Sequence, residues 1–347
     1  MKRHKICKII FAILAVFLCV AFYELIGICI TYKKQPAVSD ATIKETQNIM
    51  SVAGRENTER AVIIEKNSQA LLERVRLIQN AKNEIILSTF AFKSDESGKL
   101  ILGALHDAAD RGVHVRILVD GMESWIDMEG NPYFYGLSSH ENVEIKLYNK
   151  ANPLKPWKTM GRMHDKYLIA DGKIYILGGR NTYNYFLGDF PGHKNFDRDV
   201  LVVCDEPQKD NSVNQLWNYF ETIWEQEDCR YFHNSKKLAD RQSVKKAVLE
   251  LQEGYQQYFE VNKEKICDKD YADETFETEK ITLLSNPIHT QAKEPVVWYQ
   301  LGELMKNAKE RVKIHTPYII CNDMMYNTWE AVSYTHLRAH ETRSNLV

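Results

Sequence analysis

A histidine, a lysine, an aspartate and an asparagine lie close together in the middle of the sequence. His164, Lys166 and Asp171 have the spacing HxKxxxxD, and Asn181 ends a GGxN tetrapeptide. A neutral imidazole can attack phosphorus and form a covalent phosphohistidine, which splits one displacement into two steps. A neighbouring ammonium can neutralise charge on the phosphate oxygens, and an asparagine amide can donate a further hydrogen bond. The pattern therefore predicts phosphodiester cleavage with no metal or other cofactor, because side chains supply the cations.

Two short strands joined by a turn should position these residues. YLIAD and KIYILGG flank Asp171 and Gly172, a pair that is typical of a β-hairpin turn. Alternate side chains of a strand share a face, so we expect His164 and Lys166 to point into one pocket. Asp171, at the turn, is better placed to support the fold or to orient a histidine than to react. Each of these residues alone would more often be structural, whereas together they predict a catalytic site.

Four more residues are candidates for the same site. Gly179 precedes Asn181 by two positions and belongs with it in a phosphate-binding segment. Thr89 lies in one predicted buried strand and Asp120 ends another, so both are candidates for the pocket. His193, in the segment PGHKNF, is a candidate for the pocket mouth.

The segments around the motif alternate between helix and buried strand. Apolar residues recur at helical spacing in residues 68–80, 100–112 and 212–226, and compact apolar runs of strand type occupy residues 84–92, 113–121, 142–149 and 200–204. This alternation is typical of an α/β domain, with a central β-sheet flanked by helices. We assign this domain to residues 61–230.

The N-terminus has the pattern of a membrane anchor. Residues 6–30 are almost entirely apolar, no charge occurs from Ile9 to Tyr23, and four basic residues precede this run. The run approaches the ~20 residues that cross a bilayer, and the basic residues should stay in the cytoplasm. A cleavable signal peptide is the alternative, but no small-x-small cleavage site follows. We expect an uncleaved single-pass anchor over residues 1–32, a polar linker over 33–60, and a catalytic domain outside the cell membrane.

Composition and cysteine content limit the remaining classes. The 347 residues are 44% hydrophobic and 27% charged, which is typical of a folded globular protein. The net charge of -2 provides no general basic field, so we do not expect a nucleic-acid partner. Four cysteines outside the anchor, Cys204, Cys229, Cys267 and Cys321, lack zinc-site spacing and leave both disulfides and buried thiols open.

A partial repeat suggests a second lobe. Residues 77–92 and 304–319 share the tripeptide NAK, followed by an apolar strand with a threonine at the same place, Thr89 and Thr316. We therefore expect a charged helical connector over residues 231–280 and the beginning of a second lobe over 281–332. The offset between the copies would place a second motif histidine beyond Val347, which predicts a fragment of a longer protein. Residues 333–347 match neither lobe and form an anomalous tail.

The central region resembles the phospholipase D superfamily, whose HxKxxxxD and GxN motifs it matches. RGVHVRILVDG, DRDVLVV and FETIW extend the resemblance over residues 61–226, and RMHDK with GGRN is most similar to the cardiolipin synthase type branch. The resemblance implies that His164 is the nucleophile or leaving-group acid, that Lys166 and Asn181 bind phosphate, and that Asp171 has a supporting role. Many members have serine where this chain has Gly179. The family builds one active site from two motifs, contributed by two lobes or two subunits, so a homodimer is possible.

These observations favour a membrane-anchored phosphodiesterase or phosphatidyltransferase that acts on phospholipids, with cardiolipin synthesis as one possible reaction. The loop KANPLKPWKTMGR before the motif combines basic residues with Trp157, and it either meets anionic headgroups or is simply solvated. A nuclease of the same superfamily is the alternative enzyme. A non-catalytic lipid-binding module is the alternative if the second motif is absent.

Overall fold

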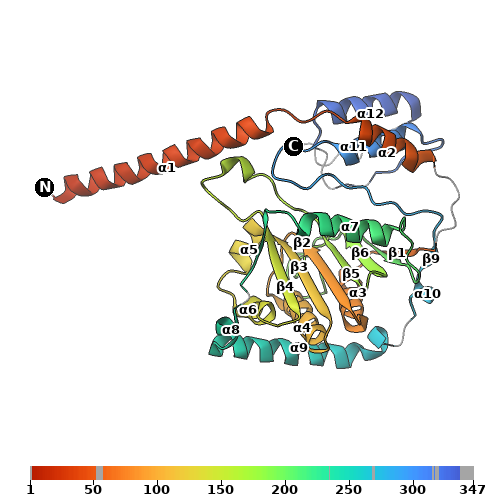
Figure 1. Cartoon of the computed structure of the whole chain (residues 1–347), viewed down its shortest axis with the longest axis horizontal. Helices are drawn as coiled ribbons and strands as arrows, with labels where there is room; N and C mark the ends of the chain where they lie inside the picture. The colour runs from red at the N-terminus through yellow and green to blue at the C-terminus, as the bar shows by residue number, and fades with distance from the viewer. Residues whose placement is uncertain are drawn as a thin grey trace. The chain divides into compact units, whose positions relative to one another are not determined.

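The chain forms two compact units. In the computed structural model, residues 2–51, 58–233, 235–267, 270–314, 316 and 320–336 are described. The first unit comprises Met1–Thr31 and Arg55–Leu283, and the second comprises Tyr32–Gly54 and Leu284–Val347. Figure 1 shows the elements of both, and they are treated separately below.

A mixed β-sheet forms the centre of the first unit. Its strand order is β8-β4-β3-β2-β5-β6-β7-β1-β9, in which β2, β3 and β4 are parallel neighbours and the other pairs are antiparallel. The strands are β1 (Arg60–Ile64), β2 (Glu84–Thr89), β3 (His114–Asp120), β4 (Val143–Tyr148), β5 (Tyr167–Ala170), β6 (Ile174–Gly178), β7 (Asp199–Val203), β8 (Cys229–Tyr231) and β9 (Phe276–Glu277). The predicted α/β class is confirmed.

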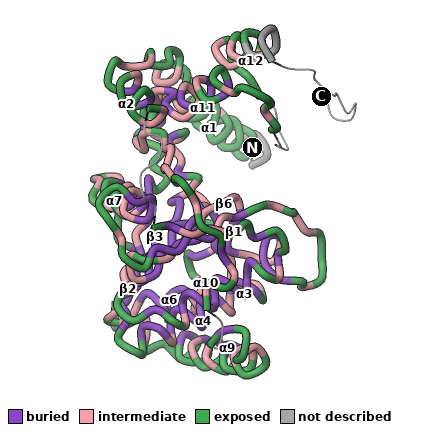
Figure 2. Tube along the Cα trace, turned by 90° about the vertical axis from the view of Figure 1, so that its right-hand side faces the viewer, coloured by how far each residue is buried: buried purple, intermediate pink, exposed green. Residues whose placement is uncertain are grey.

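Helices cover both faces of this sheet. Figure 1 shows α7 (Ser212–Trp224) on one side and α4 (Glu96–Asp110) with α9 (Gln242–Cys267) on the other, where α3 (Asn67–Asn80) and α6 (Pro132–Ser138) also pack. The central strands are therefore buried on both faces, which explains their continuous apolar sequence (Figure 2). The short elements are α5 (Gly121–Asp127), η1 (Pro156–Lys158), α8 (Lys236–Ala239) and α10 (Tyr271–Glu274).

Helix α9 lies within the predicted helical connector, residues 231–280, and packs against the first lobe. Val244, Ala247, Leu251 and Tyr255 are spaced by three or four residues and are all buried. Gly103 allows α4 and α9 to approach closely, because a Cβ there would lie 2.6 Å from the carbonyl oxygen of Leu251. The abundant charges of α9 occupy its outer face, and its apolar stripe completes the helical layer of the lobe.

The predicted polar linker over residues 33–60 is corrected, since Asp40–Ser51 forms helix α2 in the second unit. Asp40 lies in its first turn, where a negative charge is favourable. Glu294 accepts hydrogen bonds from the Ser39 amide at 2.8 Å and from the Thr42 hydroxyl at 2.6 Å. A partner distant in the sequence therefore stabilises the start of the helix, which the local pattern did not indicate.

The second unit also contains α11 (Val296–Lys306) and α12 (Asp323–His336). The repeat predicted a helix followed by a strand, and α11 supplies the helix. Residues 311–314 and 316 are not in a strand, and the other residues of the predicted strand lie outside the described part. A strand needs a neighbour to satisfy its backbone, and the described residues of this unit offer none. Of the predicted tail, residues 337–347 lie outside the described part.

Helix α1 (Lys2–Tyr32) is long and apolar enough to cross a membrane, with a mean hydropathy of 2.7 over its most apolar window. The side chains of residues 5–31 are largely exposed to the surroundings. All seven cysteines are free thiols, and Cys204 and Cys229 are buried within the lobe. No disulfide therefore links the four cysteines outside α1.

Candidate active site

The predicted hairpin is present as β5 and β6. Asp171 and Gly172 both have positive φ, 53° and 63°, and the Lys173 amide donates to the carbonyl of Ala170 at 3.0 Å. These are the features of a type I′ turn, which favours the residue pair found here. One detail differs, since β5 begins at Tyr167 and the motif residues His164 and Lys166 precede it.

A buried carboxylate holds the segment that precedes β5. The Met163 amide donates to Oδ2 of Asp120 at 3.2 Å, so a side chain takes the place of a strand partner there. The other oxygen of Asp120 accepts from the Met122 amide at 3.0 Å at the start of α5 and also binds Arg162. Asp120 is therefore a positioning residue, which fixes the backbone directly before His164.

Strand directions bring most of the predicted residues to one edge of the sheet. Strands β2, β3 and β6 end there at Thr89, Asp120 and Gly178, and the antiparallel strands β5 and β7 begin there. We call it the site edge. Asp171, at the far end of β5, lies at the opposite edge. Its carboxylate accepts the amides of Lys82, Asn83 and Glu84 at 2.9, 2.7 and 3.0 Å, so it holds the backbone that leads into β2.

The imidazole of His164 is accessible at the site edge. The residue is exposed, while the ring of Phe90 packs 4.6 Å from its ring centroid. Partial burial lowers the pKa of His164 below its ordinary value, the positive charge of Lys166 lowers it further, and Asp120 opposes both effects. The ring is therefore mostly neutral near pH 7, which is the protonation state that a nucleophilic histidine requires.

Lys166 is buried beside it. The side chain is 6% exposed, and Nζ donates to the carbonyl of His164 at 2.6 Å. Burial lowers the pKa of Lys166 to about 8, against the opposing effect of Asp165 and Asp197. A cation held in a low-dielectric position interacts strongly with an approaching anion, because little water screens it.

The GGRN segment packs closely against the loop that follows β2. The side-chain oxygen of Asn181 accepts from the Ala91 amide at 3.2 Å, and the Thr182 amide donates to the Ala91 carbonyl at 3.0 Å. Thr89 supports the same loop, since its hydroxyl donates to the Ala91 carbonyl at 3.1 Å. These contacts orient the side-chain amide of Asn181. Thr89 contributes indirectly, because it holds the backbone of Ala91, to which Asn181 is bonded.

Gly179 is required by its neighbour Asp197. A Cβ at position 179 would lie 2.0 Å from Oδ2 of Asp197, so no side chain fits without displacing that carboxylate. The sequence did not single out Asp197, although DRDVLVV was noted as part of the family resemblance. The structure adds it to the site because its charge acts on Lys166.

Arg180 is a second residue near the site that the sequence motif did not indicate. It is 1% exposed and forms a buried ion pair with Asp199 at 3.2 Å, and Asp199 also pairs with Arg74 at 2.9 Å. Its guanidinium donates to the carbonyl of Ile64 at 3.2 Å. These contacts tie the GGRN loop to β1 and β7, which fixes the backbone on either side of Asn181.

His193 lies at the protein surface, where its ring centroid is 5.5 Å from that of Tyr185. Neither residue takes part in the hydrogen bonds that link Asn181, Thr182 and Thr89 to Ala91. The structure thus brings Thr89, Asp120, His164, Lys166, Gly179 and Asn181 to one edge of the sheet, and leaves His193 exposed in the loop before β7.

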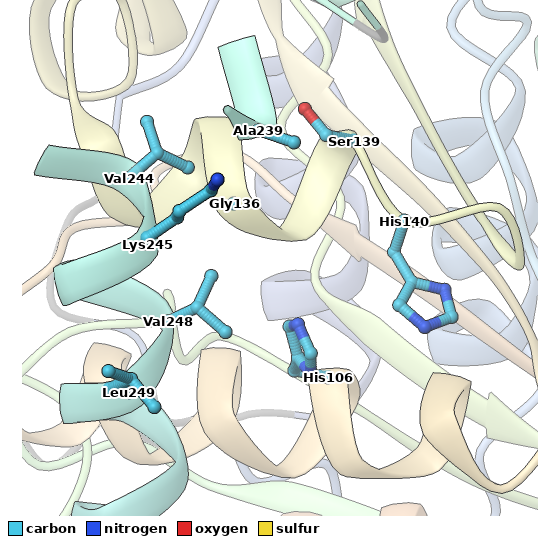
Figure 3. Close-up of a pocket in the computed structure, with 9 residues that line it drawn as sticks. All are labelled: His106, Gly136, Ser139, His140, Ala239, Val244, Lys245, Val248 and Leu249. Atoms are coloured by element: carbon cyan, nitrogen blue, oxygen red, sulfur yellow. The ribbon is translucent and has the colours of Figure 1, made fainter. Parts of the chain in front are cut away.

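A separate cavity of about 420 Å³ lies in the helical layer, among α4, α6, α8 and α9 (Figure 3). It is lined by apolar side chains of α9 and by polar residues from α4 and from the end of α6; the set is His106, Gly136, Ser139, His140, Ala239, Val244, Lys245, Val248 and Leu249. Asp110 binds both histidines, at 3.0 Å to His106 and 3.1 Å to His140. None of the predicted site residues lines this cavity.

Comparison with known proteins identifies similar sequences. Residues 75–224 match the family model described as "Cardiolipin synthase, PLD-like domain". An uncharacterized protein of Helicobacter pylori (strain ATCC 700392 / 26695) is 27% identical over 293 residues, which cover 76% of this chain and 55% of that protein. Cardiolipin synthase C of Escherichia coli (strain K12) is 29% identical over 154 residues, 40% of this chain and 31% of the synthase.

Among solved structures, the phospholipase D family member Nuc from Salmonella typhimurium has a TM-score of 0.37 and 18% sequence identity. That match covers 50% of this chain and 99% of Nuc. The chain spans about half of the Helicobacter pylori relative and about a third of the synthase.

Proposed function

Because residues 75–224 form a phospholipase D-like domain of the cardiolipin synthase type, we propose that this protein is a membrane-anchored phosphodiesterase or phosphatidyltransferase that acts on phospholipids. The observation that carries the proposal is an accessible, mostly neutral imidazole, His164, beside the buried ammonium of Lys166. The assignment of the phospholipid as substrate is supported by the relative named cardiolipin synthase C.

The proposed reaction has two displacement steps. A ring nitrogen of His164 forms a bond to phosphorus, and the bond between phosphorus and the headgroup alcohol oxygen breaks. Lys166 and Asn181 bind the non-bridging oxygens, whose charge grows in each transition state. An acceptor alcohol or water then attacks phosphorus and loses its proton, and the bond between nitrogen and phosphorus breaks. A phospholipid hydroxyl as the acceptor would give cardiolipin, and water would give phosphatidic acid.

The leaving alcohol must receive a proton, and the family pattern assigns this role to a second motif. In our proposal the second motif comes from a second lobe or from another subunit of a homodimer. Asp120 and Asp171 do not fill the role in our proposal, because both carboxylates are engaged by backbone amides.

The proposed location is the cell membrane. Helix α1 would cross it once, with the basic residues before it in the cytoplasm and the lobe outside. The single pass and the external lobe are inferred from charge distribution and hydropathy. Nucleic acid is not a proposed substrate, because the net charge of -2 provides no general attraction for it.

Incubation with labelled phosphatidylglycerol and phosphatidylethanolamine vesicles tests the proposal. We expect lipid turnover by the intact protein, none by His164→Ala, and normal turnover by His114→Ala, a matched control. His114 lies at the opposite end of β3, where it pairs with Glu144. Cardiolipin formation would identify a transferase, and free headgroup alone a phospholipase.

Labelling of the lipid phosphorus provides a direct check of the intermediate. Acid-labile, base-stable label on the protein, absent from His164→Ala, is the expected result. No lipid turnover together with His164-dependent cleavage of DNA would overturn the proposed function in favour of a nuclease. Lipid binding with neither reaction would favour a non-catalytic module.

A further inference from the structure

Large apolar side chains are exposed around the site edge. Trp125 is 65% exposed and Ile126 is comparable, both on α5, and Phe196 is 80% exposed before β7. In the loop between β4 and β5, Leu154, Trp157 and Met160 are also exposed. We call these six residues the apolar rim. Exposed tryptophan, phenylalanine and aliphatic side chains that gather at one edge of a sheet are typical of an interaction surface.

Sheet topology places the rim on both sides of His164. Helix α5 follows β3 and the β4–β5 loop follows β4, whereas Phe196 precedes β7. In the strand order, β5 lies between β3 and β7, so the motif histidine is flanked by the two parts of the rim. Gly121 allows the start of α5 to lie directly against the β4–β5 loop, because a Cβ at this position would lie 2.6 Å from the amide nitrogen of Lys150. Figure 1 shows α5 and this loop on the same side of the lobe.

Helix α1, in the same unit, approaches the rim near its C-terminal end. A Cβ at Gly27 would lie 2.6 Å from Cγ of Pro156, and the Tyr23 hydroxyl is 3.5 Å from the Leu154 carbonyl. If Lys8 marks the inner boundary of the bilayer, the ~20 residues needed to span it extend to about residue 28. Pro156 and its neighbours then lie at the level of the outer headgroups.

We propose that the apolar rim is a bilayer-docking surface, which inserts into the outer headgroup region and presents His164 to lipid phosphodiesters at that depth. This inference deepens the proposed function and rests on it. Tryptophan suits the membrane interface because its ring is apolar and its N–H is polar. Lys150 and Lys155, both exposed in the same loop, lie where anionic phosphates would attract them.

The basic residues of this loop are not equivalent. Lys158 pairs with Asp228 at 2.5 Å, and Arg162 binds Asp120, so both are engaged within the lobe. Lys150 and Lys155 are exposed, and α5 itself carries Glu123 and Asp127. The apolar side chains therefore provide most of the proposed attachment, and the two lysines add a preference for anionic lipid.

Tryptophan fluorescence in vesicles tests the docking directly. The whole chain is reconstituted in phosphatidylglycerol and phosphatidylcholine vesicles, with phosphatidylcholine brominated near the glycerol end of its acyl chains as the quencher. Replacing Trp125 and Trp157 together by phenylalanine should reduce the quenched signal at least about twofold. Trp217→Phe is the matched control, because Trp217 packs beside Gly172 at the opposite edge. An equal change for both variants, or no change for either, would overturn the proposal.

A second pair of variants tests the consequence for activity. Ile126→Ser with Phe196→Ser should lower turnover of vesicle lipid about tenfold and leave turnover of a soluble short-chain phosphodiester unchanged. Leu249→Ser with Val261→Ser, exposed apolar residues of α9, should change neither. Equal loss on both substrates would mean that the rim supports folding or the site, which contradicts docking.

The fluorescence result is independent of the proposed reaction. His164→Ala should be quenched as strongly as the unmodified protein even though it turns over no lipid. Quenching without turnover would leave the docking surface standing and remove the proposed function. Turnover without quenching of Trp125 and Trp157 would support the proposed function and overturn the docking surface. Recovery of a stable protein complex that shields both tryptophans from the brominated lipid would replace the bilayer by a protein partner.

Discussion

The two edges of the central sheet hold the same kinds of side chain in different bonding arrangements. At the opposite edge, Asp110 binds His106 and His140, and the carboxylate of Asp171 accepts three backbone amides. At the site edge, the ring of His164 is accessible, and Lys166 donates to a backbone carbonyl instead of to a carboxylate. The first arrangement satisfies polar groups within the fold. The second leaves an imidazole and an ammonium able to exchange their contacts for those of a substrate.

The main difference between the two edges is Lys166, which is buried and donates to a carbonyl oxygen instead of to a carboxylate. The pKa of Lys166 falls to about 8 because burial outweighs the attraction of Asp165 and Asp197. Such a position costs stability, since a buried charge lacks full hydration. A residue type alone therefore does not identify a site, and the neighbouring bonds do. The predictions that follow test this difference from the largest expected effect to the smallest.

Replacement of His164 should have the largest effect. His164→Ala removes the proposed nucleophile, and turnover should fall about 10⁴-fold or more. His140→Ala should retain turnover within a few-fold, because His140 is bonded to Asp110 at the other edge. The measurement is the initial rate of lipid turnover at matched concentrations of folded protein. Comparable losses in the two variants would remove the distinction between the edges.

Lys166 should show opposite effects on activity and on stability. Lys166→Met should lower turnover about 10²–10³-fold, because a cation is lost from the transition state. The same variant should be more stable at pH 7, by about 1–3 kcal/mol, because the cost of burying a charge is removed. Chemical denaturation checks the second expectation. A destabilised and inactive Lys166→Met protein would show that Lys166 stabilises the fold, which contradicts a role for its charge in the reaction alone.

The pH dependence follows from the same values. Turnover requires neutral His164, whose pKa is lowered, and charged Lys166, so it should decline as pH rises through about 8. Lys166→Arg should remove this alkaline decline. The stability of the protein should also depend on pH in this interval. Above about pH 8 the folded protein loses the Lys166 proton, whereas the unfolded chain keeps it up to the ordinary lysine pKa. The free energy of unfolding should therefore rise between these two pH values. A pH-independent rate across this interval would contradict the assignment.

Sequence and structure agree where the pattern is local. The hairpin around Asp171 and Gly172 was predictable because the turn type demands such residues. Thr89 and Asp120 were predicted to lie in buried strands, but only the pairing of β2, β3 and β5 in the structure brings them to the edge where His164 lies. The role of Asp197 beside Gly179 was not visible, because the two are separated by a loop and only the tertiary fold brings them together. Helix α2 was missed for the same reason, since its N-terminal partner Glu294 is distant in the sequence.

Asp171 tests whether a motif residue is structural. Asp171→Ala deprives the amides of Lys82, Asn83 and Glu84 of their acceptor, so we expect a loss of about 2–3 kcal/mol of unfolding free energy. Turnover per folded molecule should stay within about tenfold of normal, because the residue lies at the edge away from His164. Denaturation and rate measurements on the same samples check both. A full loss of turnover with unchanged stability would assign Asp171 a direct chemical role.

The smallest effect should come from Asp110. The Asn142 amide donates to Nδ1 of His140 at 3.1 Å, so the proton of that ring lies on Nε2 and points to Asp110. Asp110→Asn keeps one acceptor oxygen for two histidines, and the loss of one hydrogen bond should cost about 1 kcal/mol of unfolding free energy. Asp110→Ala removes both acceptors and should cost roughly twice as much. Neither variant should alter lipid turnover, because the carboxylate acts only within the fold at that edge. A drop in turnover without a drop in stability would mean that the His106 and His140 cluster communicates with the site edge, and the two edges would then have to be treated as one functional unit.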